Sequence, residues 1–269
     1  MRVPILLHIP HSSTKLPAEY RAAFCLSDAQ LQTELLHMTD RYVDAFALPG
    51  LTRLRFPVSR LVCDVERFRS DGDESMASVG MGAVYTHGSL GQPIRRISPP
   101  QKEELLRRYY DAHHRRLAAL AGEMLHRCSN CTVLDLHSFA SVALPYEQNG
   151  TAPRPEICIG TDPFHTPEAL YAHAEQFFRN RGYTVGRNTP FAGTIVPLPY
   201  YRTEAALHSM MLEIRRDLYM DEKTGGKTAG FTRVRNDVWA YQRELVHRGS
   251  AAENTVDQKA VFLIGSQTV

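Results

Sequence analysis

Val133-Leu134-Asp135-Leu136-His137-Ser138 is the stretch that decides how this chain of 269 residues folds. A short run of β-branched and aliphatic residues that ends in a histidine predicts a buried strand with an imidazole at its end. A similar pattern stands near the N-terminus, where Pro4-Ile5-Leu6-Leu7-His8-Ile9-Pro10 runs into His11-Ser12-Ser13. In α/β enzymes, ligands bind at the carboxyl ends of strands. Two strands that each present an imidazole there predict a metal site.

Apolar runs alternate with stretches of helical periodicity along the rest of the chain. We predict strands at residues 3–9, 51–58, 61–65, 132–136, 156–160, 183–186 and 208–214. Helices are predicted near residues 27–46, 99–126, 167–180 and 233–248, and the first is either continuous or broken near Thr39-Asp40, since either residue could cap a second segment. This alternation predicts an α/β fold with a mostly parallel sheet that is covered on both faces. Residues 66–84 are rich in Gly, Ser and Asp and predict a long functional loop. The residues after Gly249 predict either a loose tail or an added edge strand.

Composition sets bounds on the class of protein. With 43% hydrophobic residues, the chain can bury the core of one large α/β domain or of two small ones. The formal charge of +2 is too small to imply a nucleic-acid or membrane partner by itself. Neither a membrane-spanning apolar run nor a secretion leader is recognisable. The odd number of cysteines predicts a reduced, cytoplasmic protein: Cys25, Cys63, Cys128, Cys131 and Cys158. The oligomeric state is left open.

His11 and His137 are the first two predicted metal ligands. A catalytic zinc site takes three protein ligands from histidines and carboxylates and keeps its fourth position for water. The third ligand should be an acidic residue near the first histidine. Asp40 is the leading choice, although its position equally suits a helix N-cap. Glu34 and Asp44 are the alternatives for the same role.

Glu213 is a carboxylate inside the apolar run Ser209-Met210-Met211-Leu212-Glu213-Ile214. Burial of a carboxylate is costly unless the group is paired or functional. One interpretation is a structural salt bridge with Arg215 or Arg60. The other is a general base whose pKa is raised by loss of solvent. Asp135, two residues before His137, points to the same side of its strand and is expected to orient the site.

Arg60 and Arg67 frame the predicted strand at residues 61–65. They are either surface salt-bridge partners or, beside a metal site, a clamp for a carboxylate substrate. The Cys128-Ser129-Asn130-Cys131 spacing lacks a second cysteine pair, and we interpret it as incidental. We expect His113 and His114 to be solvated on their helix, and His87 to lie in an active-site loop.

Further motifs follow one another along the chain: Pro10-His11-Ser12-Ser13, Asp40-Arg41-Tyr42-Val43-Asp44, Ser59-Arg60-Leu61-Val62 with Asp64 and Arg67, Gly82-Ala83-Val84-Tyr85-Thr86, Asp135-Leu136-His137-Ser138-Phe139, Ile159-Gly160-Thr161, Asn188-Thr189-Pro190-Phe191-Ala192-Gly193, Leu212-Glu213-Ile214-Arg215-Arg216 and Leu218-Tyr219-Met220. In this order, from about residue 4 to 245, the chain resembles the N-formylglutamate amidohydrolase (deformylase) family. Several motifs in the correct order are far more specific than any one of them.

The resemblance implies one catalytic domain over residues 1–269, with a three-layer phosphorylase/hydrolase-like α/β fold. The mostly parallel mixed sheet of that fold is similar to the sheet of the zinc carboxypeptidases. The implied reaction is the zinc-dependent hydrolysis of N-formyl-L-glutamate to L-glutamate and formate, a step of histidine degradation in the cytoplasm. The implied zinc ligands are His11, Asp40 and His137, the implied base is Glu213, and the implied substrate-binding residues are Arg60, Arg67 and Asn188.

Two departures from the family pattern leave alternatives open. Ser13 stands where the family often has Gly, and Glu66 stands where it often has Asn. Glu66 adds negative charge near the expected carboxylate clamp, so a metal-dependent hydrolase of another N-acyl amino acid or peptide amide is one alternative. A non-catalytic, Arg-rich module that binds anions is an alternative from another class. The identity of the divalent metal in the cell is also open.

Overall fold

Six strands form one mixed sheet in the order β2-β1-β3-β6-β4-β5. The computed structural model describes residues 4–147 and 150–264, with side chains up to residue 247. Strands β1, β2, β3 and β6 are mutually parallel, whereas β4 and β5 run antiparallel to β6. The strand bounds are β1 Ile5–Ile9, β2 Thr52–Arg55, β3 Cys131–Phe139, β4 Ile157–Thr161, β5 Val185–Arg187 and β6 Leu207–Arg215. The predicted mostly parallel sheet is confirmed.

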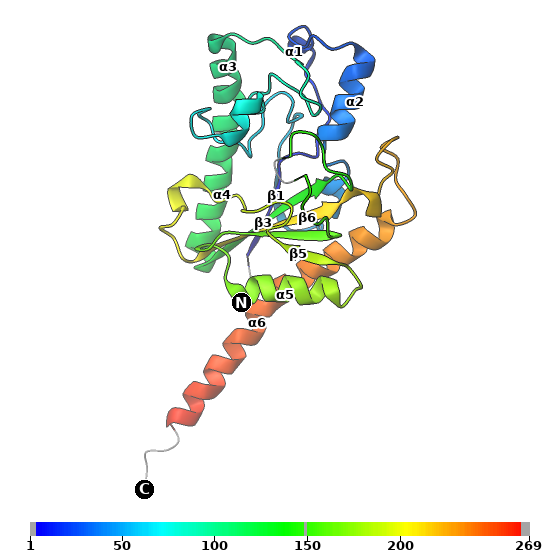
Figure 1. Cartoon of the computed structure of the whole chain (residues 1–269). Helices are drawn as coiled ribbons and strands as arrows, with labels where there is room; N and C mark the ends of the chain where they lie inside the picture. Colours follow the sequence, from blue (N-terminus) through cyan, green and yellow to red (C-terminus); the bar gives the residue numbers. More distant parts are fainter. Residues whose placement is uncertain (1–3, 148–149, 265–269) are drawn as a thin grey trace.

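Helices cover both faces of this sheet (Figure 1). Helix α4 (Ala112–Cys128) packs against one face, where Leu117 and Leu120 meet Leu6 and Val133. Helices α5 (Glu168–Arg179) and α6 (Phe231–Ile264) cover the other face and form the largest apolar cluster with the alternate strand residues. The three-layer α/β architecture predicted from the sequence is therefore confirmed. Among the described residues, none of the helices combines the length and apolar character that a membrane crossing needs.

Shorter elements lie beyond the carboxyl ends of the parallel strands (Figure 1). They are α1 (Ala18–Arg21), α2 (Asp28–Met38), the 3₁₀ segments Val43–Phe46 and Ser75–Val79, and α3 (Pro99–Leu105), which runs through a π-helical turn at Leu106–Asp111 into α4; further 3₁₀ turns stand at Leu198–Tyr200 and Arg216–Leu218. Ser27 caps α2 by accepting a hydrogen bond from the Gln30 amide, as the Ser27-Asp28 pair suggests. This end of the sheet thus carries loops rather than a continuous helical layer.

The period of two along a strand decides which residues reach the α4 side. In β3, Leu134 and Leu136 join the cluster under α5 and α6, whereas Val133 packs under α4. Asp135 and His137 share the face of Val133. The polar residues of β3 therefore point to the α4 side, at the end of the sheet where α4 gives way to loops.

Three expectations differ from the structure. The predicted strand at residues 61–65 is wrong, because this segment forms tight turns in which the Val62 amide bonds the Ser59 carbonyl and the Asp64 amide bonds the Ala83 carbonyl. Its apolar residues are buried, but under loops rather than in the sheet. The strand predicted at 51–58 shortens to β2. Beyond Gly249 the chain continues α6 to Ile264, and residues 265–269 lie outside the described residues.

Candidate active site

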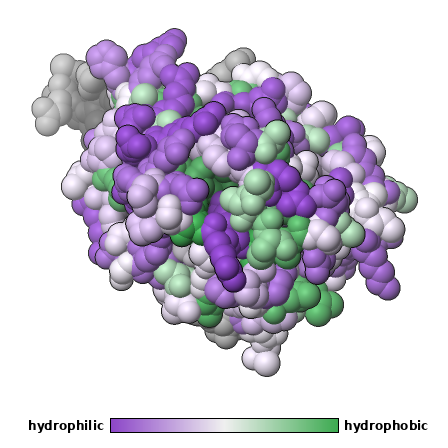
Figure 2. Space-filling view, turned by 90° about the horizontal axis from the view of Figure 1, so that it is seen from above, coloured by the Kyte–Doolittle hydropathy of each residue, from purple (hydrophilic) through white to green (hydrophobic). Residues whose placement is uncertain are grey.

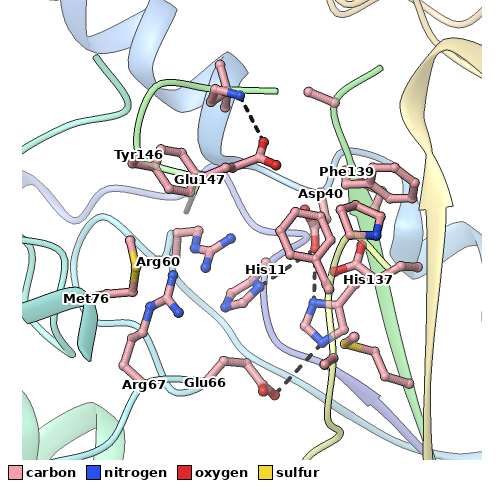
Figure 3. Close-up of a pocket in the computed structure, with 18 of the residues that line it drawn as sticks. His11, Asp40, Arg60, Glu66, Arg67, Met76, His137, Phe139, Tyr146 and Glu147 are labelled. Atoms are coloured by element: carbon pink, nitrogen blue, oxygen red, sulfur yellow. Dashed lines mark hydrogen bonds and ion pairs between the residues drawn. The ribbon is translucent and has the colours of Figure 1, made fainter. Parts of the chain in front are cut away.

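His11, Asp40 and His137 come together from three separate parts of the chain. His11 follows β1, Asp40 follows α2, and His137 lies within β3, two residues before its end. The Asp40 amide donates to the His11 carbonyl at 3.0 Å, which ties the two loops together. Asp40 Oδ2 lies 3.3 Å from His137 Nδ1 and 3.7 Å from His11 Nδ1. All three side chains are buried (Figure 3).

Two of these facing atoms are left without hydrogen bonds. His11 Nδ1 and Asp40 Oδ2 are buried and have no hydrogen-bond partner among the described residues. Buried polar atoms without partners are rare in folded proteins because each costs about 1–3 kcal/mol. One carboxylate oxygen and two imidazole nitrogens, within 4.8 Å of one another, are a donor set that zinc accepts. The residues present therefore fit a divalent ion.

Each histidine forms a hydrogen bond through Nε2 with a buried carboxylate. His11 Nε2 bonds Asp64 Oδ1 at 2.8 Å, and His137 Nε2 bonds Asp135 Oδ1 at 2.9 Å. A hydrogen bond at Nε2 fixes the tautomer and leaves the Nδ1 lone pair for a metal. Asp135 lies where the sequence predicts it, on the same side of β3 as His137 and in contact with it. Asp64 was missed, although a carboxylate inside the apolar run Val62-Cys63-Asp64-Val65 is the same signal that drew attention to Glu213.

Asp40 is the acidic residue that faces both histidines. Arg216 donates to Asp40 Oδ1 at 2.9 Å, which leaves Oδ2 directed toward the histidines. Burial would raise the pKa of the Asp40 carboxyl, but the nearby imidazoles of His11 and His137 and the charge of Arg216 outweigh that effect. The pKa of Asp40 is therefore held well below its ordinary value. Arg216 was not predicted as a site residue.

The two alternative acidic residues lie in other structural roles. Glu34 accepts hydrogen bonds from the Ser89 amide and hydroxyl, at 2.6 and 2.9 Å, and thereby supports a loop. Asp44 is partly exposed and pairs with Arg55 at 3.4 Å. Geometry thus brings Asp40, and neither alternative, beside the two histidines.

Glu213 lies next to His137 on the neighbouring strand. The register of β3 and β6 pairs His137 with Glu213, and Glu213 Oε2 is buried without a hydrogen-bond partner. Burial raises the pKa of the Glu213 carboxyl to about 8, against the opposing charge of His137. The ion pair considered from the sequence is absent from the described residues, since Arg215 and Arg60 both pair with aspartates elsewhere. The carboxylate is therefore buried, unpaired and adjacent to the His–Asp–His cluster.

The cluster opens into a pocket of about 390 Å³ that Arg60 and Arg67 line on the opposite side (Figure 3). Arg60 binds Asp64 Oδ2 through Nε and Nη2 at 3.0 and 2.7 Å, whereas Arg67 Nε has no hydrogen-bond partner among the described residues. Met76 belongs to the same wall, so the loop predicted at residues 66–84 does reach the pocket. Seen from above, this end of the molecule is largely hydrophilic, with hydrophobic side chains near its centre (Figure 2).

Asn188 also lines the pocket, but its side chain is engaged elsewhere. Its Oδ1 accepts from the Thr161 amide and its Nδ2 donates to Thr161 Oγ1, both at 2.8 Å. Its positive φ of 52° places it in the left-handed region that asparagine tolerates. The amide therefore shapes the pocket wall, and both its ends are already hydrogen-bonded.

A buried histidine pair supports the site from below. His8 Nδ1 bonds Asp135 Oδ1 at 2.8 Å, and His8 Nε2 lies 2.7 Å from His113 Nε2. Burial disfavours the charged form of His8, yet Asp135 and Glu66 outweigh that effect and raise its pKa to about 9. His8, Glu66 and Asp135 are also close enough to hold an ion. His8 Nδ1 hydrogen-bonds Asp135 Oδ1 at 2.8 Å and lies 3.1 Å from Glu66 Oε1, which has no hydrogen-bond partner among the described residues.

The expectation for the other histidines is partly wrong. His113 is buried, and burial lowers its pKa to about 2. His114 bonds the Val65 carbonyl at 2.9 Å. His113 faces His8 in β1 and His114 faces the loop at Val65, so neither ring is solvated as expected. His87 lies outside the pocket lining and bonds Thr86 at 3.0 Å.

Known proteins are similar to this chain in sequence and in fold. Residues 3–220 match the family model described as N-formylglutamate amidohydrolase. The chain is 26% identical over 235 residues to the N-formylglutamate deformylase of Pseudomonas aeruginosa, covering 82% of this chain and 84% of that protein. A crystal structure of N-formylglutamate amidohydrolase from Ralstonia eutropha superposes with a TM-score of 0.80 at 25% identity, over 92% of this chain and 95% of the other. A gene product of Agrobacterium tumefaciens, 19% identical over 90% and 92% of the two chains, shares the fold with a TM-score of 0.60.

The α/β fold, the buried polar cluster and these relatives place the chain among the amidohydrolases, enzymes that hydrolyse amide bonds. Because the family model covers most of its length, the chain belongs to the N-formylglutamate amidohydrolase family. The fold expected from the sequence resemblance is thereby confirmed.

Proposed function

We propose that this protein is a zinc-dependent amidohydrolase that cleaves N-formyl-L-glutamate to L-glutamate and formate. The observation that carries the proposal is the pair of buried atoms without partners, His11 Nδ1 and Asp40 Oδ2, which face His137 Nδ1. In the proposed site, His11, Asp40 and His137 hold the zinc ion. When bound there, zinc polarises the formyl oxygen and lowers the pKa of water toward about 7.

Glu213 is the proposed general base. Its unpartnered Oε2 takes a proton from the attacking water while the water oxygen bonds to the formyl carbon. As the carbon–nitrogen bond breaks, Glu213 returns that proton to the departing amine. The carboxyl is suited to both steps because burial raises its pKa above the ordinary value, which makes it a stronger proton acceptor.

Arg60 and Arg67 are the proposed clamp for the carboxylates of the substrate. They line the same pocket as the His–Asp–His cluster, and the pocket volume of about 390 Å³ is that of a small-molecule site. Guanidinium groups bind carboxylates through paired N–H donors, which would fix the formyl amide over the zinc ligands. Asn188 is proposed to assist substrate binding indirectly, because it shapes the wall of the pocket. Residues 1–269 are proposed to form one catalytic domain.

Breakdown of histidine in the cytoplasm is the setting that the family resemblance implies for this reaction, and it belongs to the proposal. The finer substrate choice rests on the relatives, whose names specify N-formylglutamate. Glu66 lines the pocket, but its carboxylate lies toward the histidines rather than the arginines, with Oε1 4.0 Å from His137 Nε2 and 3.1 Å from His8 Nδ1. The alternative of another N-acyl amino acid is tested together with the main proposal.

The test combines metal analysis with product release. Purified protein is stripped with a chelator, reloaded with zinc, and assayed for formate and L-glutamate with N-formyl-, N-acetyl- and N-succinyl-L-glutamate and with N-formyl-L-leucine. We expect about one zinc per chain, and release of formate only from the loaded protein. N-formyl-L-glutamate should give the highest kcat/KM of the panel. Full activity in the stripped protein would remove zinc from the proposal, and a preference for an acetyl or uncharged substrate would replace its substrate.

A further inference from the structure

Asp64 is a fully buried carboxylate that lies between the two halves of the pocket. Toward the proposed metal ligands it contacts His11 Nε2 at 2.8 Å. Toward the proposed clamp it accepts hydrogen bonds from Arg60 at 3.0 and 2.7 Å and from the Tyr85 hydroxyl. Arg67 Nε lies 3.7 Å away. One side chain therefore contacts a member of each proposed binding group.

The two oxygens of this carboxylate contact different groups, one on the side of His11 and the other on the side of Arg60. Oδ1 accepts from His11 and from the backbone amide of Glu66 at 3.0 Å. Oδ2 accepts from Arg60 and Tyr85. Because a carboxylate is planar and rigid, the position of the His11 ring is fixed relative to the plane of the Arg60 guanidinium. A displacement on one side is passed to the other through a single group.

The charge of Asp64 is as important as its shape. Arg60 and the Tyr85 hydroxyl both donate to Asp64 Oδ2, which is the contact pattern of an ionised carboxylate. The anion keeps the proton of His11 on Nε2, which leaves Nδ1 as a lone-pair donor. It also compensates the largely buried charge of Arg60, which an amide at this position would leave partly unpaired.

Asp135 provides a matched comparison inside the same site. It holds His137 Nε2 at 2.9 Å, as Asp64 holds His11 Nε2 at 2.8 Å. Its other contacts are His8 Nδ1 at 2.8 Å and the Ile195 amide at 3.2 Å. Within the described residues, Asp135 makes no ion pair with an arginine. The two carboxylates thus share the metal-side contact and differ in the substrate-side contact.

We propose that Asp64 is a positioning residue for both metal binding and substrate recognition, and that it couples the geometry of His11 to that of Arg60. Asp135 positions a metal ligand alone. This inference rests on the proposed function, since it takes His11 as a zinc ligand and Arg60 as part of the carboxylate clamp. It adds a residue to which sequence reasoning assigned no role, and it predicts a different phenotype for two superficially equivalent carboxylates.

The experiment compares Asp64→Asn with Asp135→Asn in the full chain. Zinc affinity is measured by competition with a chromophoric chelator, and KM and kcat are measured for N-formyl-L-glutamate at saturating zinc. We expect both variants to lose about 10–100-fold in zinc affinity, because each frees one histidine ligand. At saturating zinc, Asp64→Asn should raise KM by tenfold or more, whereas Asp135→Asn should leave KM within about twofold of the wild type and lower kcat.

Tyr85→Phe keeps the experiment decisive if Asp64→Asn does not fold. This variant retains the carboxylate, removes one donor from Oδ2, and removes the hydroxyl that accepts from Arg60 Nε at 3.1 Å. We therefore expect KM to rise severalfold while zinc affinity stays near that of the wild type. Equal KM values in the two Asn variants, unchanged zinc affinity in Asp64→Asn, or, where Asp64→Asn does not fold, an unchanged KM in Tyr85→Phe would overturn the coupling role. A wild-type protein that binds no zinc or releases no formate would instead overturn the proposed function, so the two failures are distinguishable.

Discussion

Replacement of Glu213 by glutamine is the sharpest probe of the proposed chemistry. Glutamine has nearly the same shape as glutamate, so the substitution opens no cavity where the side chain packs beside His137. It also removes a buried carboxyl whose ionisation is disfavoured, since burial raises its pKa to about 8. The fold and the zinc ligands should therefore survive. What is lost is the carboxylate that can take a proton from water, because the carboxamide of glutamine is not basic near neutral pH.

The expected size of the effect follows from the role assigned to Glu213. A general base contributes about 10²–10⁴-fold to a rate, which corresponds to about 3–5 kcal/mol of transition-state stabilisation. Because Glu213 is placed beside the zinc ligands rather than among the arginines, the loss should fall on kcat, with KM within about threefold of the wild type. Zinc content should remain at about one per chain.

The assay measures formate release under saturating zinc and substrate, with bound metal determined on the same samples. Glu175→Gln is the matched control, since Glu175 lies on α5 and pairs with Arg179 at the surface, away from the pocket. It should behave as the wild type. If Glu213→Gln keeps more than about a tenth of the wild-type kcat while holding its zinc, Glu213 is not the base.

Three further predictions follow from the same geometry. Asp40→Asn should lower zinc affinity at least tenfold in chelator competition, whereas Asp44→Asn, at the partly exposed partner of Arg55, should leave it unchanged; equal losses would contradict the choice of Asp40. Arg67→Ala should raise KM for N-formyl-L-glutamate at least tenfold in steady-state assays, because a clamp donor is removed, and a KM that stays constant would exclude Arg67 from binding. In the metal-free protein, the pKa of Glu213 near 8 lies above its ordinary 4.5, so the protonated form stabilises the fold below pH 4.5 and this contribution is lost as the pH rises through 8. Urea unfolding at pH 5 and pH 8.5 should therefore show the stability of Glu213→Gln gaining on that of the wild type by about 4 kcal/mol at most, and a difference that does not change with pH would refute the shift.

The strands and the residues of the proposed metal site could be predicted from the sequence, because both follow from local sequence patterns. Apolar runs that end in histidine marked β1 and β3, and an isolated carboxylate in an apolar run marked Glu213. The same reasoning failed at residues 61–65, where buried apolar residues lie under loops and not in the sheet. A buried turn and a buried strand have the same composition, and only the partner of each backbone amide distinguishes them.

The supporting residues were harder to find because their roles depend on partners that are distant in sequence. His113 meets His8 across 105 positions, and Arg216 meets Asp40 across 176. From the neighbouring sequence alone, His113 looks like a histidine on a helix surface, and Arg216 looks like any of the many arginines of the chain. Asp64 was within reach, since it repeats the signal of a lone carboxylate in an apolar run, but its two-sided role becomes apparent only when His11 and Arg60 are seen on its two oxygens.

The register of the sheet is what joins these residues into one site. His8 is paired with Asp135 between β1 and β3, and His137 is paired with Glu213 between β3 and β6. Parallel strands with a period of two place all four side chains on the α4 face, in adjacent positions. A slip of one residue at β6 would turn Glu213 into the apolar layer under α5 and α6 and bring Leu212 or Ile214 beside His137. The apolar residues Leu134, Leu136 and Leu212 oppose that slip because they fill the other face. The core that stabilises the fold therefore also fixes the proposed base beside the proposed metal ligands.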